Sequence, residues 1–415
     1  MRKTILIVLT CFVCASSFAQ IVYKEIESER LNSVRKLKIK LPNNYNPEAD
    51  VKHPVIIVFD GDYLFEPVTG QVDFQTYFDD MPSSIVVGIL QGDEREYDSY
   101  YDPRTGLPID SGHRFFEFVT DELLPYIDNK YNTSKFRVAV GHDVMGNFIN
   151  AYLFKSETIF QAYVCISPDF LGSIKNLVPN RLDTAEEDIF YYMATSEKDI
   201  PVIRENIMSA DTKLKEVTNT NVSYYFDDFE GETHYTMVSS AIARSFDKIF
   251  ELYNPLREKE LEEKVFTYEG TLDNYLVDRY NRIETLFGIT KEITEIEFEK
   301  VAKVAEQRED FKSIYKLGKL ANKLFPETLL GTYYLAQSAE KLGKTKKAKK
   351  LYESAMVLSE ATYIDKDYIA SKIEELALAL VDTDELEDLE EDLEELEEDL
   401  EEIEENIEEV ENEKK

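Results

Sequence analysis

Continuous apolar runs and helical patterns alternate along the first part of the chain, from residue 21 to about residue 255. Such runs predict strands buried on both faces, because a strand inside a parallel sheet has helices above and below it. The fold class that we predict is therefore α/β, with a mostly parallel sheet in a domain covering residues 20–255. Six runs meet this description: 55–59, 84–89, 137–140, 162–166, 189–193 and 222–226.

The pattern changes after residue 255, where helical patterns rich in Glu and Lys begin and no further strand run follows. Ala302, Ala336 and Ala370 recur there at a period of 34 residues. That period is typical of tetratricopeptide repeats, and the chain resembles this family at small and aromatic positions. We expect an all-α tetratricopeptide-like domain of two helical hairpins and a capping helix; an ordinary helical bundle is the alternative. The expected bounds are 256–294 for a helical linker and 295–380 for the repeats.

A third pattern occupies residues 381–415, where apolar residues recur in steps of three and four, as in coiled coils. The stretch from Asp382 to Lys415 contains 21 of the 83 acidic residues of the chain. It contains only 2 of the 47 basic residues. Self-pairing would bring like charges together, so we interpret the segment as a solvated, disordered acidic tail. A helix that pairs with a basic partner or binds divalent cations is the alternative. The apolar positions are Leu386, Leu389, Leu393, Leu396, Leu400, Ile403, Ile407 and Val410.

Residues 1–19 have the pattern of a secretory signal peptide, because Arg2 and Lys3 precede an apolar run and a cleavage position follows Ala19. The run of roughly eleven apolar residues is shorter than the about 20 that a membrane-spanning helix needs. We therefore expect an exported protein, periplasmic or secreted, with no transmembrane segment in the mature chain. Cys165 is the one cysteine that follows this signal, so no intrachain disulfide is expected.

The whole chain has 415 residues and a formal net charge of -36 at pH 7. Nucleic acids and anionic lipids repel a polyanion of this kind, so nucleic-acid binding is excluded as a function. The partners that we expect are a protein, bound through the helical repeats, and a small-molecule ligand in the α/β domain. The sequence predicts no cofactor and no resident metal.

Residues 138–147 (VAVGHDVMGN) come directly after a predicted strand and begin a predicted helix. This is the position and shape of a nucleophile elbow, the sharp turn that exposes a nucleophile at the end of a strand. Together with 54–65 (PVIIVFDGDYLF), 162–168 (AYVCISP) and 231–238 (GETHYTMV), this segment resembles the putative-esterase family of α/β hydrolases. That family includes esterase D and the ferric enterobactin esterases. The resemblance covers residues 30–250 and implies the α/β-hydrolase fold.

The resemblance also implies a role for each matching residue. Asp143 stands at the position of the nucleophilic serine, and His234 stands at that of the general base. Glu197 or Asp199, just after a predicted strand, stands at the position of the acid that orients the histidine. The sequence leaves the choice between these two acids open.

An oxyanion hole is a further feature that the resemblance implies. One of its donors would be the backbone N–H of Val144, directly after the nucleophile position. The other would come from the loop after Phe59, at Asp62 or Tyr63.

Two residues depart from the family's pattern. Asp143 replaces the serine, and Met145 replaces the small residue that a tight elbow requires. A carboxylate that attacked an ester carbonyl would have to expel an alkoxide and form an anhydride, so acyl transfer of the serine type is expected to be lost. Our leading interpretation is a degenerate esterase that acts as a binding or assembly module of the cell envelope.

Two alternatives stay open. Gly-His-Asp at the elbow also resembles epoxide hydrolases and haloalkane dehalogenases, in which the carboxylate attacks an sp³ carbon and a histidine activates water. Asp143 and His234 would then belong to an active hydrolase of a small substrate. In the other alternative, Asp60 and Asp62 join Asp143 as ligands of a hard cation, although aspartates at a strand end often cap backbone N–H groups instead.

Overall fold

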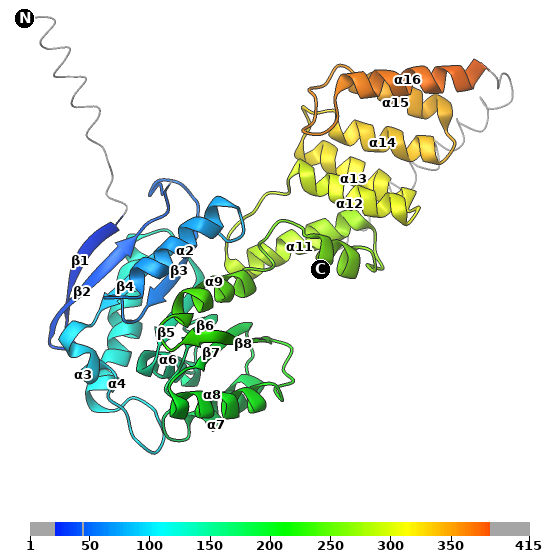
Figure 1. Cartoon of the computed structure of the whole chain (residues 1–415). Helices are drawn as coiled ribbons and strands as arrows, with labels where there is room; N and C mark the ends of the chain where they lie inside the picture. The colour runs from blue at the N-terminus through cyan, green and yellow to red at the C-terminus, as the bar shows by residue number, and fades with distance from the viewer. Residues whose placement is uncertain (1–20, 44, 382–415) are drawn as a thin grey trace, which may run out of the picture. The chain divides into compact units, whose positions relative to one another are not determined.

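The structure of the protein is a computed structural model that describes residues 21–43 and 45–381. The predicted signal peptide and the acidic tail lie outside the described residues. Figure 1 shows the course of the chain, with strands and helices mixed in its first part and helices alone in its last part.

The chain divides into two compact units. The first consists of Met1–Pro255 and Arg279–Glu292, and the second of Leu256–Asp278 and Ile293–Lys415. One division therefore falls where the sequence pattern changes, and another falls within helix α11 (Leu272–Phe287). The segment expected to be a helical linker is shared between the two units.

An eight-stranded sheet forms the centre of the first unit, in the order β1-β2-β4-β3-β5-β6-β7-β8. β1 pairs with β2, and β2 with β4, in antiparallel fashion. The remaining neighbours in the sheet are parallel. The predicted α/β-hydrolase fold with a mostly parallel sheet is confirmed, and all six predicted strands are present. The strands are β1 (Ile21–Ser28), β2 (Ser33–Lys40), β3 (His53–Val58), β4 (Ile85–Leu90), β5 (Thr133–His142), β6 (Ala162–Ile166), β7 (Ile189–Lys198) and β8 (Val222–Thr233).

The strands β1 and β2 are missing from the prediction. In β2, Leu37 and Ile39 are buried whereas Lys36 between the buried positions is exposed. This alternation is typical of an antiparallel strand near the edge of a sheet, where one face is left to solvent. A search for continuous apolar runs therefore does not detect either strand.

Helices cover both faces of the sheet (Figure 1). Residues of α4, α5, α7 and α8 enter the core on one face, and residues of α2, α9 and α11 enter the core on the other. Short α3 and α6 follow strand ends. The bounds are α2 (Phe65–Tyr77), α3 (Arg95–Asp98), α4 (Asp110–Glu117), α5 (Leu124–Lys130), α6 (Val144–Phe148), α7 (Ile174–Asp183), α8 (Pro201–Leu214) and α9 (Met237–Ile249).

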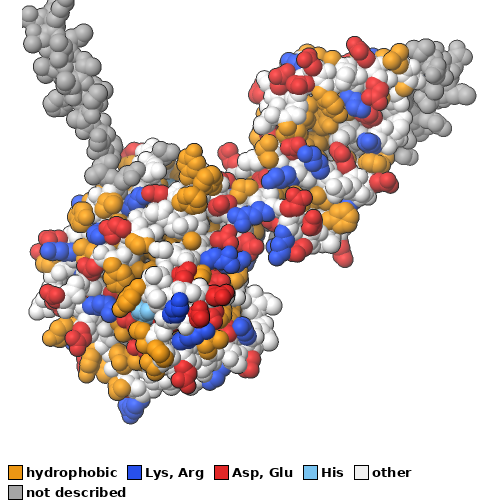
Figure 2. Space-filling model, in the orientation of Figure 1, with side chains coloured by type: hydrophobic (Ala, Val, Ile, Leu, Met, Phe, Trp, Pro, Cys, Tyr) orange, Lys and Arg blue, Asp and Glu red, His pale blue; other side chains and the backbone are white. Residues whose placement is uncertain are grey.

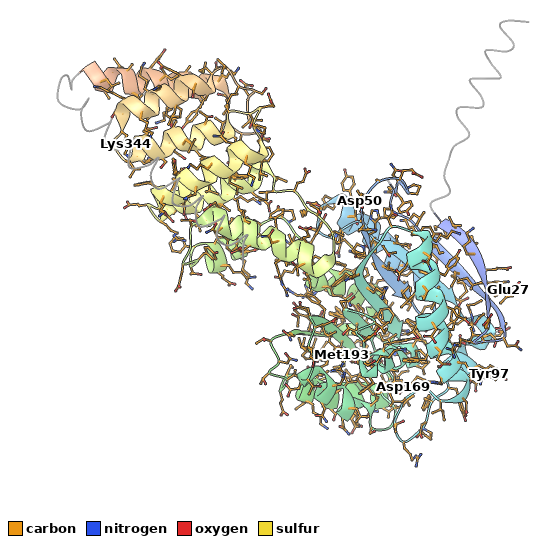
Figure 3. The ribbon with its side chains drawn as sticks, turned by 180° about the vertical axis from the view of Figure 1, so that it is seen from behind. Glu27, Asp50, Tyr97, Asp169, Met193 and Lys344 are labelled. Carbon is orange, nitrogen blue, oxygen red and sulfur yellow. The ribbon has the colours of Figure 1, made fainter. Side chains whose placement is uncertain are left out.

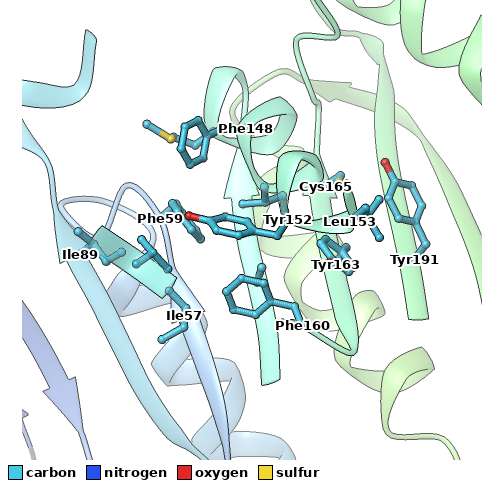
Figure 4. Packing of buried hydrophobic residues seen from close by; sticks show 14 of the residues in the cluster. Ile57, Phe59, Ile89, Phe148, Tyr152, Leu153, Phe160, Tyr163, Cys165 and Tyr191 are labelled. Carbon is cyan, nitrogen blue, oxygen red and sulfur yellow. The ribbon is translucent and has the colours of Figure 1, made fainter. Parts of the chain in front are cut away.

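Aromatic side chains pack tightly in the core on the first of these faces, as Figure 4 shows. The ring of Phe59, at the end of β3, lies 6.0 Å from that of Phe148 and 6.1 Å from that of Tyr152, measured between centroids. Tyr152 also meets Phe160 edge to face at 5.1 Å. Because Phe59 directly precedes one loop of the site and Phe148 belongs to α6, this packing holds two parts of the site together.

The core on the other face includes the second half of α11. The ring of Phe287 lies 4.9 Å from that of Phe136 on β5 and 5.5 Å from that of Phe250 after α9. Phe287 and Ile283 are fully buried. These contacts explain why Arg279–Glu292 belongs to the first unit and is more than a connection between domains.

The second unit is all-helical in its described residues, which confirms the predicted helical extension. Its helices share one core, to which each of α12 to α16 contributes buried residues. A capping box formed by Thr294 and Glu297 begins α12, and the Asp310 carboxylate accepts a hydrogen bond from the Ser313 N–H at the start of α13. The bounds are α10 (Glu258–Glu260), α12 (Glu295–Gln307), α13 (Phe311–Leu324), α14 (Leu330–Lys341), α15 (Thr345–Ala355) and α16 (Lys366–Val381).

Two glycines allow α13 and α14 to approach closely. A Cβ at Gly318 would lie 2.9 Å from the Gly331 carbonyl oxygen, and a Cβ at Gly331 would lie 2.2 Å from Asn322 Oδ1. Any larger side chain at either position would push the helices apart. α13 therefore meets α14 at a backbone contact.

The surface carries mixed charges. On the face in view in Figure 2, acidic and basic side chains are interspersed, with hydrophobic ones scattered among them. Across residues 21–43 and 45–381, no helix combines the length and the apolar character that crossing a membrane requires.

Candidate functional site

The turn between β5 and α6 has a strained backbone at its centre. Asp143 lies there with φ 57° and ψ -126°, a conformation that residues with a side chain seldom adopt. The Asp143 N–H donates to the Ile166 carbonyl, and the Asp143 carbonyl accepts from the Asp169 N–H, both at 3.1 Å. The strand end of β6 thus holds the elbow in place, and the Asp143 side chain stays 25% exposed.

The elbow accommodates the bulk of Met145. A Cβ at Gly141 would lie only 2.5 Å from the Met145 carbonyl oxygen, so glycine is required at position 141. The Met145 side chain itself is fully buried in the core, with its sulfur 3.8 Å from Gln91 Nε2. Methionine is flexible enough to fill such a space, so the departure at position 145 is compatible with the sharp turn.

His234 and Asp199 form a buried pair at the same edge of the sheet. His234 Nδ1 lies 2.8 Å from Asp199 Oδ1, and the two side chains are 6% and 0% exposed. Burial raises the pKa of the Asp199 carboxyl. Hydrogen bonds from His234, from two hydroxyls and from the Ile200 N–H have the opposite effect, and together they hold that pKa below its usual range. Asp199 is therefore ionised at neutral pH. The hydroxyls belong to Ser167 and Thr195.

Glu197, the other acid proposed from the sequence, lies elsewhere. Its carboxylate is exposed and accepts a hydrogen bond from the Gly231 N–H at 2.8 Å. Of the two candidate acids, only Asp199 contacts His234 among the hydrogen bonds and ion pairs of the described residues. The two residues are separated by the end of β7 at Lys198, after which the chain turns to bring Asp199 inward.

Ser167 is a site residue that the sequence did not indicate. Its Oγ lies 2.7 Å from Asp199 Oδ2 and 3.0 Å from His234 Nδ1. Since Asp199 accepts hydrogen bonds only, the Nδ1–H of His234 and the hydroxyl of Ser167 both donate to it. Nε2 of His234 has no hydrogen-bond partner among the described residues, so it is the nitrogen left for chemistry.

The loop after Phe59 offers one of the two N–H groups expected there. The Tyr63 N–H donates to the Asp60 carbonyl at 3.1 Å, whereas the Asp62 N–H donates to no other described residue. Val144 is the first residue of α6, where a backbone N–H has no acceptor within the helix. Asp62 and Val144 are therefore the two candidate donors that keep an available N–H.

Arg95 is a second site residue that the sequence did not indicate. Its guanidinium donates to both carboxylate oxygens of Asp60, at 2.7 and 3.0 Å, and reaches Asp143 Oδ2 at 3.4 Å. Burial raises the pKa of the Asp60 carboxyl, and the bonds from Arg95 oppose that shift. The elbow carboxylate thus lies beside a positive charge that is shared with a neighbouring aspartate.

The carboxylates proposed as cation ligands have other partners. Asp60 is paired with Arg95, and Asp62 Oδ2 accepts from the N–H groups of Gln91 and Gly92 at 2.8 and 3.1 Å. In the described part of the chain, no three His, Cys, Asp or Glu side chains are grouped as a metal site. The cation interpretation therefore finds no support in the geometry.

His142, directly before the elbow, is buried against His234. The two rings are 4.5 Å apart between centroids, and His142 Nε2 lies 3.3 Å from the His234 carbonyl oxygen. Burial, and to a smaller extent the nearby His234, lower the pKa of His142 to about 4. A neutral His142 donates its Nε2–H to that carbonyl. The Tyr63 hydroxyl, which donates to Asp60 Oδ2 at 3.0 Å, lies 3.1 Å from His142 Nδ1.

Asp169, which is labelled in Figure 3, adds a further carboxyl beside the elbow, because its N–H donates to the Asp143 carbonyl. Burial raises its pKa, and the negative charge of Asp143 raises it further. The site therefore combines the exposed carboxylate of Asp143, a buried Asp–His pair with an available nitrogen, and two available backbone N–H groups.

The family model described as putative esterase matches residues 28–237, about half of the chain. No curated protein matches the sequence. An uncharacterised protein from Capnocytophaga ochracea is 28% identical, with a TM-score of 0.76 over 86% of this chain and 100% of its own. That similarity extends beyond the part that the family model matches.

Two further solved structures share the fold. An IroE-like serine hydrolase from Shewanella oneidensis is 18% identical, with a TM-score of 0.52 over 70% of this chain and 95% of its own. The BES protein from Bacillus cereus is 20% identical, with a TM-score of 0.50 over 58% of this chain and 96% of its own. At these identities the likeness concerns the fold alone.

Proposed function

Because this chain belongs to the putative-esterase family of α/β hydrolases, we propose that it is a degenerate member of that family that binds a ligand and does not cleave esters. The single observation that carries the proposal is the Asp143 carboxylate at the centre of the elbow. A serine there would attack an ester carbonyl and form a stable acyl-enzyme. A carboxylate would instead form an anhydride, which the departing alkoxide readily attacks to restore the ester.

The surroundings of Asp143 support the same proposal. Arg95 approaches its carboxylate, at 3.4 Å, and withdraws electron density from the oxygen that would attack. In this proposal Asp199, His234 and the N–H groups of Val144 and Asp62 are retained parts of an ancestral esterase site. Their polar groups would contact a small-molecule ligand.

We further propose that the protein works outside the cytoplasm as a binding or assembly module of the cell envelope. The signal-like pattern of residues 1–19 supports export. The helical extension supports a role in assembly, because helical repeats of the tetratricopeptide type present extended surfaces to protein partners. The 34-residue period supports the assignment of that type.

The proposal predicts that the purified mature protein hydrolyses p-nitrophenyl acetate and butyrate no faster than the buffer does. The release of p-nitrophenol, followed by absorbance, measures this directly. His234→Ala is the matched control, because it removes the only described base paired with Asp199. Turnover by the unaltered protein that disappears in His234→Ala would overturn the proposal.

A second candidate is an active hydrolase in which Asp143 attacks an sp³ carbon. The observation in its favour is the buried Asp199–His234 pair, whose Nε2 has no partner among the described residues and is available to activate water. In such a reaction the Asp143 oxygen forms an ester with the substrate carbon and the leaving group departs. Water, deprotonated by His234, then hydrolyses that ester.

This second candidate predicts a covalent adduct in the His234→Ala variant. Without the base, the ester on Asp143 forms but is not hydrolysed. After incubation with a haloacid and with an epoxide, mass spectrometry of the intact chain and of the peptide that contains Asp143 detects the added mass. Asp143→Asn with His234→Ala is the control that should stay unmodified, and the absence of any adduct counts against this chemistry.

A further inference from the structure

Two carboxylates beside the elbow lack a close positive partner. Asp143 Oδ2 lies 3.4 Å from Arg95 Nη2, and the other oxygen of Asp143 has no partner among the described residues. The Asp169 carboxyl is partly buried, and it forms no hydrogen bond or ion pair in the described part of the chain. A carboxylate that is partly shielded from water needs a donor or a cation beside it. These two groups therefore offer binding positions to a positively charged ligand.

Arg95 does not balance the charges of both carboxylates. Its guanidinium donates to the two oxygens of Asp60 at 2.7 and 3.0 Å, the close two-bond geometry of a strong ion pair. Its contact with Asp143, at 3.4 Å, is longer. One positive group thus stands against the carboxylates of Asp60, Asp143 and Asp169, and a net negative charge remains beside the elbow.

The Nε2 nitrogen of His234 is a third group without a partner. The side chain of His234 is only 6% exposed. Since its Nδ1–H donates to Asp199, a neutral His234 carries a lone pair at Nε2. No described residue donates a hydrogen bond to this nitrogen. A buried acceptor is costly without a donor, so Nε2 indicates a donor that comes from outside the chain.

The three acceptors lie in one part of the molecule. The Asp169 N–H donates to the Asp143 carbonyl at 3.1 Å, and the ring of His142, directly before Asp143, lies 4.5 Å from that of His234. Burial raises the pKa of the Asp169 carboxyl, the charge of Asp143 raises it further, and that of His234 lowers it, so both charges act on Asp169. Among the described residues these side chains are not grouped as a metal site. An organic cation suits them better than a metal ion.

Two exposed tyrosine rings lie beside these acceptors. Tyr235 directly follows His234, its ring lies 4.9 Å from the His234 ring between centroids, and it is 75% exposed. Tyr63 is 45% exposed, and its ring lies 6.0 Å from that of His142. Aromatic rings attract ammonium groups and pack against the apolar part of a ligand. The surroundings of the acceptors therefore also suit a cation that carries an apolar group.

We propose that the ligand of this site is a primary amine, bound as its ammonium ion. This inference rests on the proposed function, in which the site binds a ligand and does not cleave esters. An ammonium group has one positive charge, three N–H donors and no acceptor. It thus matches two carboxylates and one imidazole nitrogen, while the apolar part of the amine packs against Tyr235. Asp143, at the position of the family's serine, supplies a charge that a serine would lack.

Isothermal titration calorimetry of the full mature protein, at pH 7 and about 0.15 M salt, tests this proposal with three probes. They are 2-phenylethylamine, the neutral 2-phenylethanol, and 2-phenylethyltrimethylammonium, which has the charge but no N–H donor. We expect the amine to bind at least about tenfold more tightly than the alcohol, and several-fold more tightly than the trimethylammonium compound, because charge-assisted hydrogen bonds are the strongest of these contacts. No binding of the amine, or an affinity no higher than that of either other probe, would overturn the proposal.

Charge-removal variants show where the amine binds. Asp143→Asn combined with Asp169→Asn should weaken amine binding at least about tenfold and leave binding of the alcohol nearly unchanged. The matched control, Glu48→Gln combined with Asp50→Asn, removes two exposed charges from the loop before β3, whereas the site follows the other end of that strand. Circular dichroism checks the fold of both variants. Equal affinities for the amine would mean that the general negative charge of the protein holds it, which contradicts the proposal.

The same protein preparations separate this inference from the proposed function. Hydrolysis of p-nitrophenyl esters that requires His234 would overturn the proposed function, whether or not the amine binds. Absence of amine binding, in a protein that also hydrolyses no ester, would overturn the assignment of the ligand alone.

Discussion

Replacing Asp143 with serine is expected to raise the rate of p-nitrophenyl acetate hydrolysis at least about 10²-fold above that of the unaltered protein. The backbone at this position already has the strained elbow conformation, with φ 57° and ψ -126°. The Asp199–His234 pair is in place, and Nε2 of His234 has no competing partner among the described residues. A positioned base alone contributes about 10²–10⁴ to a reaction of this kind.

Two controls show whether this gain is due to the proposed chemistry. Asp143→Asn removes the charge of the carboxylate without adding a nucleophile and should stay inactive. Asp143→Ser combined with His234→Ala should lose the gain, because the serine then lacks its base. If Asp143→Ser is no faster than Asp143→Asn, the site has lost more than its nucleophile, and the elbow is only a structural remnant.

Replacing Asp98 with alanine is expected to lower the free energy of unfolding of the first unit by about 3–5 kcal/mol. Arg35 on β2 donates to both oxygens of Asp98, at 2.6 and 2.8 Å, and both side chains are about 95% buried. Removing the carboxylate leaves a buried guanidinium without its counter-charge. Gln91, which links Asp98 to the Asp60 N–H, would also lose a partner, so the loop of the site should loosen.

The pair of Arg204 and Asp228 is the matched control for this prediction. It has the same two-bond geometry, at 2.6 and 2.8 Å, but its side chains are 28% and 34% exposed. Asp228→Ala should therefore cost at most about 1 kcal/mol. Pulse proteolysis in increasing urea, read from peptides of β5, reports the unfolding of the first unit. Equal costs for the two variants would show that burial of the Arg35 pair contributes little.

Much of the first unit can be predicted from local sequence patterns. Six of the eight strands, the α/β-hydrolase fold and the position of the elbow at Asp143 all follow from apolar runs and from four short segments in a fixed order. The all-helical extension follows from helical periodicity in the same way. The signal peptide, the tetratricopeptide assignment, the acidic tail and the partners stay predictions, as does the role of each site residue.

Residue periodicity shows which side of a strand or helix faces the core, because local geometry fixes which positions share a side and the apolar side is driven out of water. It cannot show which loops converge at the end of the sheet. Only the tertiary structure distinguishes Asp199 from Glu197 as the partner of His234, and only it brings Ser167 and Arg95 to the site. These residues come from different loops, and their contacts depend on the order and parallel pairing of the strands. Chain folding in three dimensions, rather than any local pattern, therefore decides the composition of the site.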